Sequence, residues 1–163
     1  SGSCSYSMKR IISVILIVIS SVSCDPEIYL SGGHESEWFI KNNTDVTFSV
    51  SWMYDDIYEK VQIAPGDSIA LGVVRSIRSI GDPKFSYITE IVGSGDDKGL
   101  IFYSENGFPI RHWRWSQRND SGRQLFDESL WRKYVRDQQP QPDRKGYLDV
   151  TWVFDVFSED LQK

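Results

Sequence analysis

The stretch "YLDVTWVFDVF", Tyr147 to Phe157, has a large apolar residue at every second position from 148 to 156. These apolar residues are Leu148, Val150, Trp152, Phe154 and Val156. The polar residues Asp149, Thr151 and Asp155 stand between them. Because successive side chains of a strand point to opposite faces, the pattern predicts a strand with one buried and one wet face. Such strands are typical of antiparallel sheets.

A second alternating stretch, "DVTFSVSW", lies at residues 45–52, where Val46, Phe48, Val50 and Trp52 alternate with threonine and serine. Further strands are expected at Trp38–Lys41, Ile57–Ile63, Ser68–Val74, Phe85–Val92 and Leu100–Ser104, and Val73–Ile80 is ambiguous. Turn-forming sequences such as "APGD", "GSGDDKG" and "ENGFP" separate these runs. The chain is therefore predicted to be mainly β, an antiparallel β-sandwich of immunoglobulin-like or transthyretin-like type.

One short helix is expected at 127–135, in the sequence "DESLWRKYV". Asp127 is a suitable N-cap, and Leu130, Trp131 and Tyr134 have helical spacing. The end of the chain, "SEDLQK", is predicted to form a final turn capped by Ser158. The patch "RDQQPQPDRKG", residues 136–146, is predicted to be an exposed loop because of its prolines and polar residues.

The most hydrophobic run, "MKRIISVILIVISSVSC", extends from Met8 to Cys24. It begins with Lys9 and Arg10, continues with an apolar segment about half as long as a membrane-spanning helix requires, and ends in small residues. This order is typical of a secretory signal peptide. Small residues that lead into a cysteine resemble the lipobox of bacterial lipoproteins, although Ser21 replaces the usual aliphatic residue.

The run divides the chain into four predicted parts. Residues 1–7 are an upstream extension or cloning remnant, 8–23 a lipoprotein signal peptide, 24–36 a lipidated tether, and 37–163 a single β-sandwich domain. Cys24 is the predicted lipidation site, with palmitate among its acyl chains. Two or three acyl chains hold a protein firmly to a membrane. The predicted location is the cell envelope, with the outer membrane favoured.

Two longer segments give a family resemblance. The first is "FIKNNTDVTFSVSW" followed by "IAPGDSIAL", and the second is "LFDESLWRKYV" followed by "GYLDVTWVFDVFSEDL". Their order resembles that of a family of small lipoproteins of gut Bacteroidetes. The resemblance covers most of the chain after Cys24 and implies an envelope lipoprotein with a β-sandwich domain of no established activity. It implies no catalytic residue.

Charge and composition exclude several functions. Removal of residues 1–23, which carry Lys9 and Arg10 and no acid, changes the formal net charge from −5 to −7, so nucleic acid is not an expected partner. With two histidines, His34 and His112, and one cysteine after cleavage, neither a metal site nor a cofactor site is predicted. The acidic loop "GSGDDKG" could attract calcium, but a simple turn is favoured.

The stretch "RHWRWSQR", residues 111–118, is the best candidate for a ligand surface, comprising Arg111, Trp113, Arg114 and Trp115. On a strand, Arg111, Trp113 and Trp115 share one face. Exposed tryptophans beside arginines suit a sugar or a protein partner. The alternative, which is favoured, is that both tryptophans lie in the core with arginines over their rings.

These observations predict a non-enzymatic binding or accessory lipoprotein that is anchored to the membrane through Cys24 and presents the sandwich to a glycan or a protein. No catalytic set is evident. Two alternatives remain open: a hydrolase with an unrecognised site near His112, and a structural or assembly subunit of a cell-surface complex. Fold class alone does not distinguish these functions.

Overall fold

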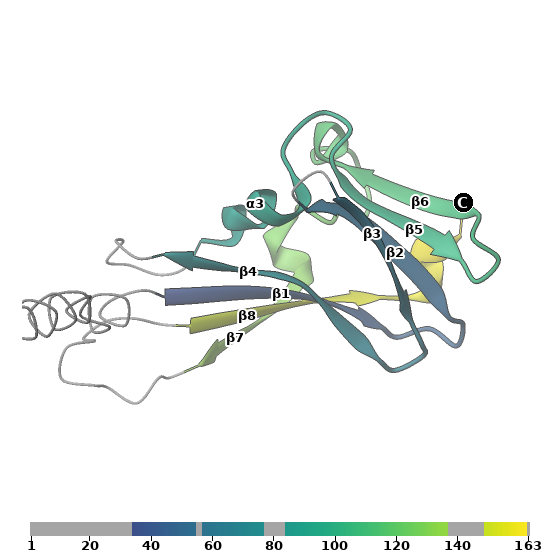
Figure 1. Ribbon diagram of the computed structural model, residues 1–163, viewed down its shortest axis with the longest axis horizontal. Helices are drawn as coiled ribbons and strands as arrows, with labels where there is room; N and C mark the ends of the chain where they lie inside the picture. Colours follow the sequence, from purple (N-terminus) through teal and green to yellow (C-terminus); the bar gives the residue numbers. More distant parts are fainter. Residues whose placement is uncertain (1–33, 55–56, 77–83, 137–148, 163) are drawn as a thin grey trace, which may run out of the picture. The chain divides into compact units, whose positions relative to one another are not determined.

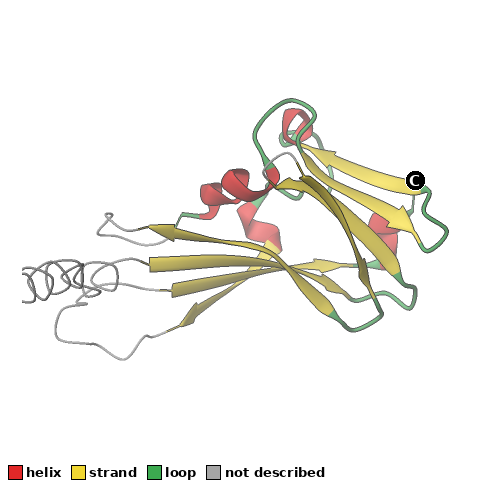
Figure 2. Cartoon of the chain, in the orientation of Figure 1, coloured by secondary structure: helices red, strands yellow, loops and turns green. Residues whose placement is uncertain are grey.

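The alternating stretches of the sequence form two four-stranded sheets. The computed structural model describes residues 34–54, 57–76, 84–136 and 149–162 (Figures 1 and 2). The strands are β1 (His34–Asn42), β2 (Phe48–Tyr54), β3 (Ile57–Ile63), β4 (Ser68–Ser76), β5 (Gly99–Ser104), β6 (Pro109–Arg114), β7 (Trp131–Arg136) and β8 (Asp149–Val156). The helix α3 (Thr89–Val92) and the 3₁₀ turns η1 (Phe85–Ile88), η2 (Trp115–Gln117), η3 (Glu128–Leu130) and η4 (Ser158–Leu161) lie between or after them.

The first sheet has the order β4-β1-β8-β7 and the second the order β3-β2-β5-β6. The predicted mainly β, sandwich-like fold is confirmed. The expectation of purely antiparallel pairing is wrong at one place, because β1 and β8 run parallel, with Trp38 beside Trp152. β1 and β8 are the first and last of the described strands, and they are neighbours in the sheet.

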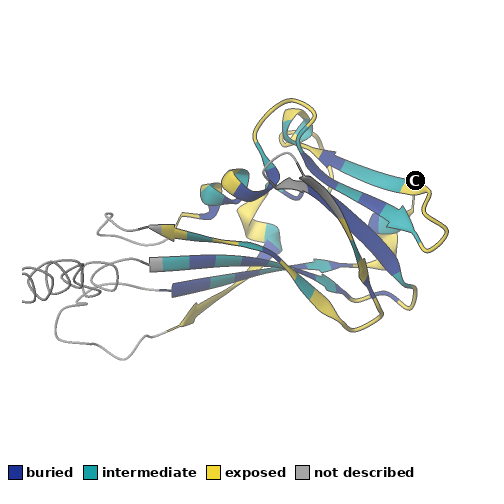
Figure 3. Cartoon of the chain, in the orientation of Figure 1, coloured by how far each residue is buried: buried dark blue, intermediate teal, exposed yellow. Residues whose placement is uncertain are grey.

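The core lies between the two sheets (Figure 3). On β8, the predicted inward residues Val150, Trp152, Phe154 and Val156 are fully buried. Trp113 belongs to the opposite sheet, and its ring packs edge to face with the ring of Phe154, with the ring centroids 5.3 Å apart. The predicted buried face of this strand is therefore confirmed for its described residues. Leu148, which the prediction included, lies outside them.

The predicted pattern of β2 is confirmed for Phe48, Val50 and Trp52, which are buried. Val46 is half exposed because it precedes the strand. Ser49 and Ser51, expected on a wet face, are also buried. Since β2 lies between β3 and β5, these small side chains are covered by larger neighbours on both sides.

The segment Phe85–Val92, predicted as a strand, forms η1 and α3 instead. Phe85, Ile88 and Ile91 are buried and spaced three residues apart, which is helical spacing. A short apolar run does not by itself separate a buried strand from a buried helical turn. This helical segment packs on β4, where a Cβ added to Gly72 would lie 3.1 Å from Ile91.

The helix predicted at 127–135 is wrong beyond its first turn. Asp127 does act as a cap, because its carboxylate accepts hydrogen bonds from the Ser129 backbone N–H (2.9 Å) and hydroxyl (2.6 Å). Only Glu128–Leu130 is helical, and β7 begins at Trp131. The indole of Trp131 packs against Phe154 of β8 at 5.1 Å, and this tertiary contact draws the segment into the sheet.

Two boundaries also differ from the sequence prediction. The predicted tether extends to Ser36, but β1 begins at His34 and Ser36 is fully buried. The last turn is not capped by Ser158. Instead, the Phe157 N–H donates to the Asp160 carboxylate and the Asp160 N–H donates to the Phe157 carbonyl, each at 2.9 Å.

The predicted signal peptide and Cys24 lie outside the described residues, as does most of the proline-bearing patch at 136–146. Among the described residues, no helix is long and apolar enough to span a membrane. These residues belong to one compact unit, Gly33–Lys163.

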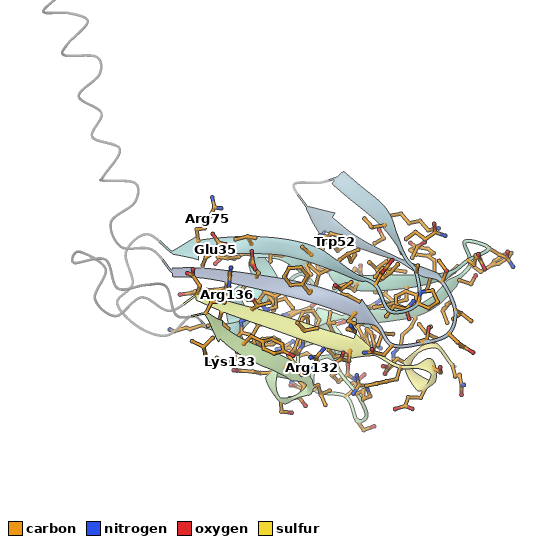
Figure 4. All side chains as sticks on the ribbon, turned by 90° about the horizontal axis from the view of Figure 1, so that it is seen from below. Glu35, Trp52, Arg75, Arg132, Lys133 and Arg136 are labelled. Atoms are coloured by element: carbon orange, nitrogen blue, oxygen red, sulfur yellow. The ribbon has the colours of Figure 1, made fainter. Side chains whose placement is uncertain are left out.

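The outer face of the first sheet carries a row of side-chain ion pairs at the end where β1 begins (Figure 4). Glu35 accepts from Arg75 at 2.8 Å, and Arg136 lies 3.1 Å from Glu37. Partly exposed pairs of this kind contribute about 1 kcal/mol or less each, so they define a solvated face and add little stability.

Candidate functional site at the edge of β6

The predicted ligand segment lies along β6, the edge strand of the second sheet, and continues into the loop between η2 and η3. This loop folds beside the strand, and together they border an open hollow of about 490 Å³. The hollow is lined by Arg111, His112, Trp113, Gln117, Asp120, Ser121 and Gln124. All of these residues except Trp113 are polar or charged, so the hollow suits a polar ligand.

Trp113 belongs to the core, as the favoured interpretation predicted. Its side chain is only 2% exposed, and its ring meets Phe102 at 5.0 Å and Phe154 at 5.3 Å, both edge to face. Its indole N–H donates to the Arg123 carbonyl at 3.1 Å. The ring therefore forms the floor of the hollow and offers no free face for stacking on a sugar.

Trp115 does not share a strand face with Trp113, so that prediction is wrong. The strand ends at Arg114, where the Trp115 N–H donates to the Lys98 carbonyl at 2.8 Å and the chain turns into η2. The half-buried indole meets Phe126 edge to face at 5.0 Å. The Arg118 guanidinium lies 4.4 Å above the indole ring and occupies a stacking face.

Arg111 is held by protein groups. Its guanidinium lies 4.5 Å from the Trp113 ring centroid and donates to the carbonyls of Arg123 (3.2 Å) and Asp160 (3.5 Å). Arg123 in turn pairs with the carboxylate of Asp160 at 2.9 Å, and this carboxylate is 1% exposed. Because a broken buried pair leaves an uncompensated charge, the Arg123–Asp160 pair fixes the loop firmly against the end of the chain.

The four predicted surface residues do not form one patch. Arg111 and Trp113 line the hollow, whereas Arg114 is exposed and Trp115 packs on Phe126; neither of these two lines it. Sequence reasoning did not name four of the lining residues: Gln117, which ends η2 within the stretch 111–118, and Asp120, Ser121 and Gln124 in the loop after it. Their polar, turn-like sequence carries no periodicity, and the ion pair that holds the loop joins residues 37 positions apart.

His112 lines the hollow and has a pKa below its ordinary value of 6.5. Partial burial is the main cause, and the positive charge of Arg114 acts in the same direction, while Asp97 partly opposes both. The ring is therefore neutral at pH 7, with one nitrogen that donates and one that accepts. Ser121 lines the same hollow, but among the described residues no hydrogen bond joins Ser121 to His112.

The acidic loop "GSGDDKG" forms a turn, as favoured. The Lys98 N–H donates to the Gly95 carbonyl at 2.8 Å, and the Ser116 hydroxyl donates to the Asp96 carbonyl at the same distance. Across the part of the chain that the structure describes, no three His, Cys, Asp or Glu side chains gather as metal ligands.

The lowered pKa of His112 predicts pH-dependent stability. As the pH falls, the imidazole of the unfolded chain takes up its proton near pH 6.5, whereas the imidazole of the folded chain takes it up only at a lower pH. The unfolded state therefore binds more protons just below pH 6.5, and the free energy of unfolding decreases as the pH falls through this range. Denaturant unfolding at pH 7.5 and 5.5 should show a smaller decrease for His112→Gln than for wild type. Equal decreases in the free energy of unfolding of the two proteins would contradict the lowered pKa of His112.

Comparison of this chain with protein-family models, with curated proteins and with solved structures finds no match.

Proposed function

We propose that this chain is a lipid-anchored protein of the bacterial cell envelope with a non-enzymatic binding role, and that the hollow beside β6 holds its ligand. The observation that carries the proposal is the lining of this hollow, in which six of seven residues are polar or charged. The ligand class that best fits such a lining is a glycan.

The fit follows from hydrogen-bonding capacity. Gln117 and Gln124 offer amide donors and acceptors, Ser121 offers a hydroxyl, and Asp120 offers a carboxylate. A neutral His112 adds one donor and one acceptor. Sugar hydroxyls both donate and accept, so a mixed lining of this kind matches them better than a lining of one charge sign. Because Arg111 is bound to backbone carbonyls, its role is to shape the site.

A binding assay tests the glycan proposal. The full chain, purified in detergent, would be applied to a glycan array, and hits would be measured by calorimetry. Asp120→Ala and Gln117→Ala should each weaken binding by about 1–3 kcal/mol, which is the usual cost of losing an important contact. Arg114→Ala is the matched control and should bind like wild type. Absence of any glycan ligand, or equal weakening by all three changes, would refute the site.

The anchor rests on the sequence from Met8 to Cys24. Metabolic labelling with a palmitate analogue should mark the protein in its native host or a related bacterium, and Cys24→Ala should lose both the label and membrane association. A Cys24→Ala protein that stays labelled and in the membrane fraction would contradict lipidation at this residue.

A hydrolase remains the alternative with a specific observation behind it, because His112 and Ser121 line the same hollow. A panel of ester, glycoside and peptide substrates distinguishes the two functions. Turnover that disappears in both His112→Ala and Ser121→Ala would favour the hydrolase. A role as a structural or assembly subunit instead predicts a stoichiometric envelope partner that is recovered equally with the Asp120→Ala protein.

A further inference from the structure

The strand β4 lies at the edge of the first sheet, so only one of its sides is paired, with β1. The hydrogen bonds of β1 show which of its residues face β4 and which face β8. The Glu35 N–H donates to the Asp149 side chain of β8 at 2.8 Å, and the Asn43 N–H donates to the Val156 carbonyl of β8 at 2.9 Å. Because this direction repeats at every second residue of a strand, the backbone groups of Glu35 and Glu37 point away from β4.

This direction decides which groups β4 presents at its free edge. The register partners of Glu35 and Glu37 on β4 are Arg75 and Val73. In an antiparallel pair, two opposite residues either exchange both hydrogen bonds or both turn their backbone groups away. Val73 and Arg75 therefore present their N–H and C=O groups at the free edge. Within the part of the chain that the structure describes, no backbone hydrogen bond joins these groups to another segment.

The free edge borders an open hollow of about 630 Å³. Figure 1 shows that β3 and β4 diverge from the turn that joins them, and both strands supply residues to the hollow. Its lining consists of Ala70, Leu71, Gly72, Val73 and Arg75 from β4, with Trp52 and Val61 from the second sheet. Val73 is 42% exposed. Arg75 is the one charged residue of this lining, which contains no hydroxyl, amide or carboxylate side chain.

The other edge strands offer less to an added strand. β7 exposes three cations, Arg132, Lys133 and Arg136, and charges at a sheet edge discourage further pairing. The loop after η2 is hydrogen-bonded to β6, and β3 supplies only Val61 to the hollow. On β4 a shift of register at Leu71 interrupts the pairing with β1. The regular free edge therefore covers residues 72–76.

An extended polypeptide matches both the free edge and the hollow. A neighbouring strand lies about 4.8 Å away and returns N–H and C=O groups to those of Val73 and Arg75. A lipid chain would leave these backbone groups without partners. A sugar would find few side-chain partners, because the lining is apolar except for Arg75. Side chains on one face of the added strand would reach Trp52 and Val61, which favours apolar residues there.

We infer that the free edge of β4, at residues 72–76, binds an extended segment of another protein. The segment adds a strand to the first sheet and places apolar side chains against Trp52 and Val61. This inference goes beyond the glycan proposal and is independent of it, because the two hollows share no lining residue.

The test uses random peptides of about 12 residues, displayed on phage and selected against the full chain in detergent. Selected peptides should carry apolar residues at alternate positions. As synthetic peptides they should bind about tenfold more weakly, or worse, to Val73→Pro, which removes an N–H of the free edge. Val73→Thr keeps this N–H, is the matched control, and should change binding by less than about twofold.

Val73→Pro should remain folded in a thermal melt, because its N–H does not face β1 and proline is tolerated on this side of an edge strand. If the variant does not fold, N-methylated peptides give the same test on the wild-type chain. Methylation of successive peptide amides should weaken binding at every second position, because only those amides face β4.

The inference would be overturned if wild type selects no peptide, if folded Val73→Pro binds like wild type, or if Val73→Thr loses as much as Val73→Pro. Equal effects of methylation at all peptide positions would overturn it as well. A concentration-dependent dimer that is absent in Val73→Pro, with no peptide selected, would instead assign the edge to a second copy of this chain. Analytical ultracentrifugation measures that dimer.

Discussion

Replacement of Gly99 by alanine should destabilise the domain by about 4 kcal/mol or more. Gly99 begins β5 with φ of +143°, a conformation that residues with a Cβ rarely adopt. A Cβ at this position would lie 1.8 Å from the carbonyl oxygen of Trp113, which belongs to the backbone of the neighbouring strand. Backbone strain costs about 1–3 kcal/mol and overpacking a further ~1–3 kcal/mol, and a paired strand leaves little room to relax.

Gly66→Ala is the matched control for this change. Gly66 also has a positive φ, +81°, but a Cβ there would have no atom within 4 Å. Its cost should therefore be limited to backbone strain, about 1–2 kcal/mol. Denaturant unfolding of both variants measures the difference. If Gly99→Ala costs no more than Gly66→Ala, the close approach of β5 and β6 at Trp113 is incorrect.

Trp113→Ala should cost about 3–5 kcal/mol, as large core truncations do. The change removes a ring that packs on Phe102 and Phe154, and it also removes one of the two hydrogen bonds that the Arg123 carbonyl accepts. The change should also disturb the hollow beside β6, because Arg123 positions the loop that carries Gln124. Ligand binding should weaken even at temperatures at which the variant is folded.

Trp115→Ala distinguishes the observed turn from a continuous strand. The side chain is half buried and contacts Phe126 and Arg118, so its removal should cost only about 1–2 kcal/mol. A continuous strand would make the two tryptophans equivalent. Urea unfolding of Trp113→Ala and Trp115→Ala, monitored by the fluorescence of the remaining tryptophans, measures how much stability each change costs. Equal costs would show that the chain does not turn after Arg114.

The sequence alone determined the features that depend on neighbouring residues. The period-two pattern from Val150 to Val156 identified a strand and its buried face, because side-chain alternation is a local property of extended backbone. Pro65 and Gly66 identified the turn before β4, and Asp127 was recognised as a cap. The run that ends at Cys24 is likewise a local pattern, and its interpretation as a lipoprotein signal remains a prediction.

Only the tertiary structure decided which distant segments meet. The parallel pairing of β1 with β8 is accompanied by a hydrogen bond from the Glu35 N–H to Asp149, 114 positions away. Trp131 joins a strand because its ring packs on Phe154, and this contact overrides the helical pattern of the local sequence. The lining of the hollow beside β6 depends on the pair between Arg123 and Asp160. The physical reason is the same in each case: the stabilising contact lies far along the chain, so no local pattern encodes it.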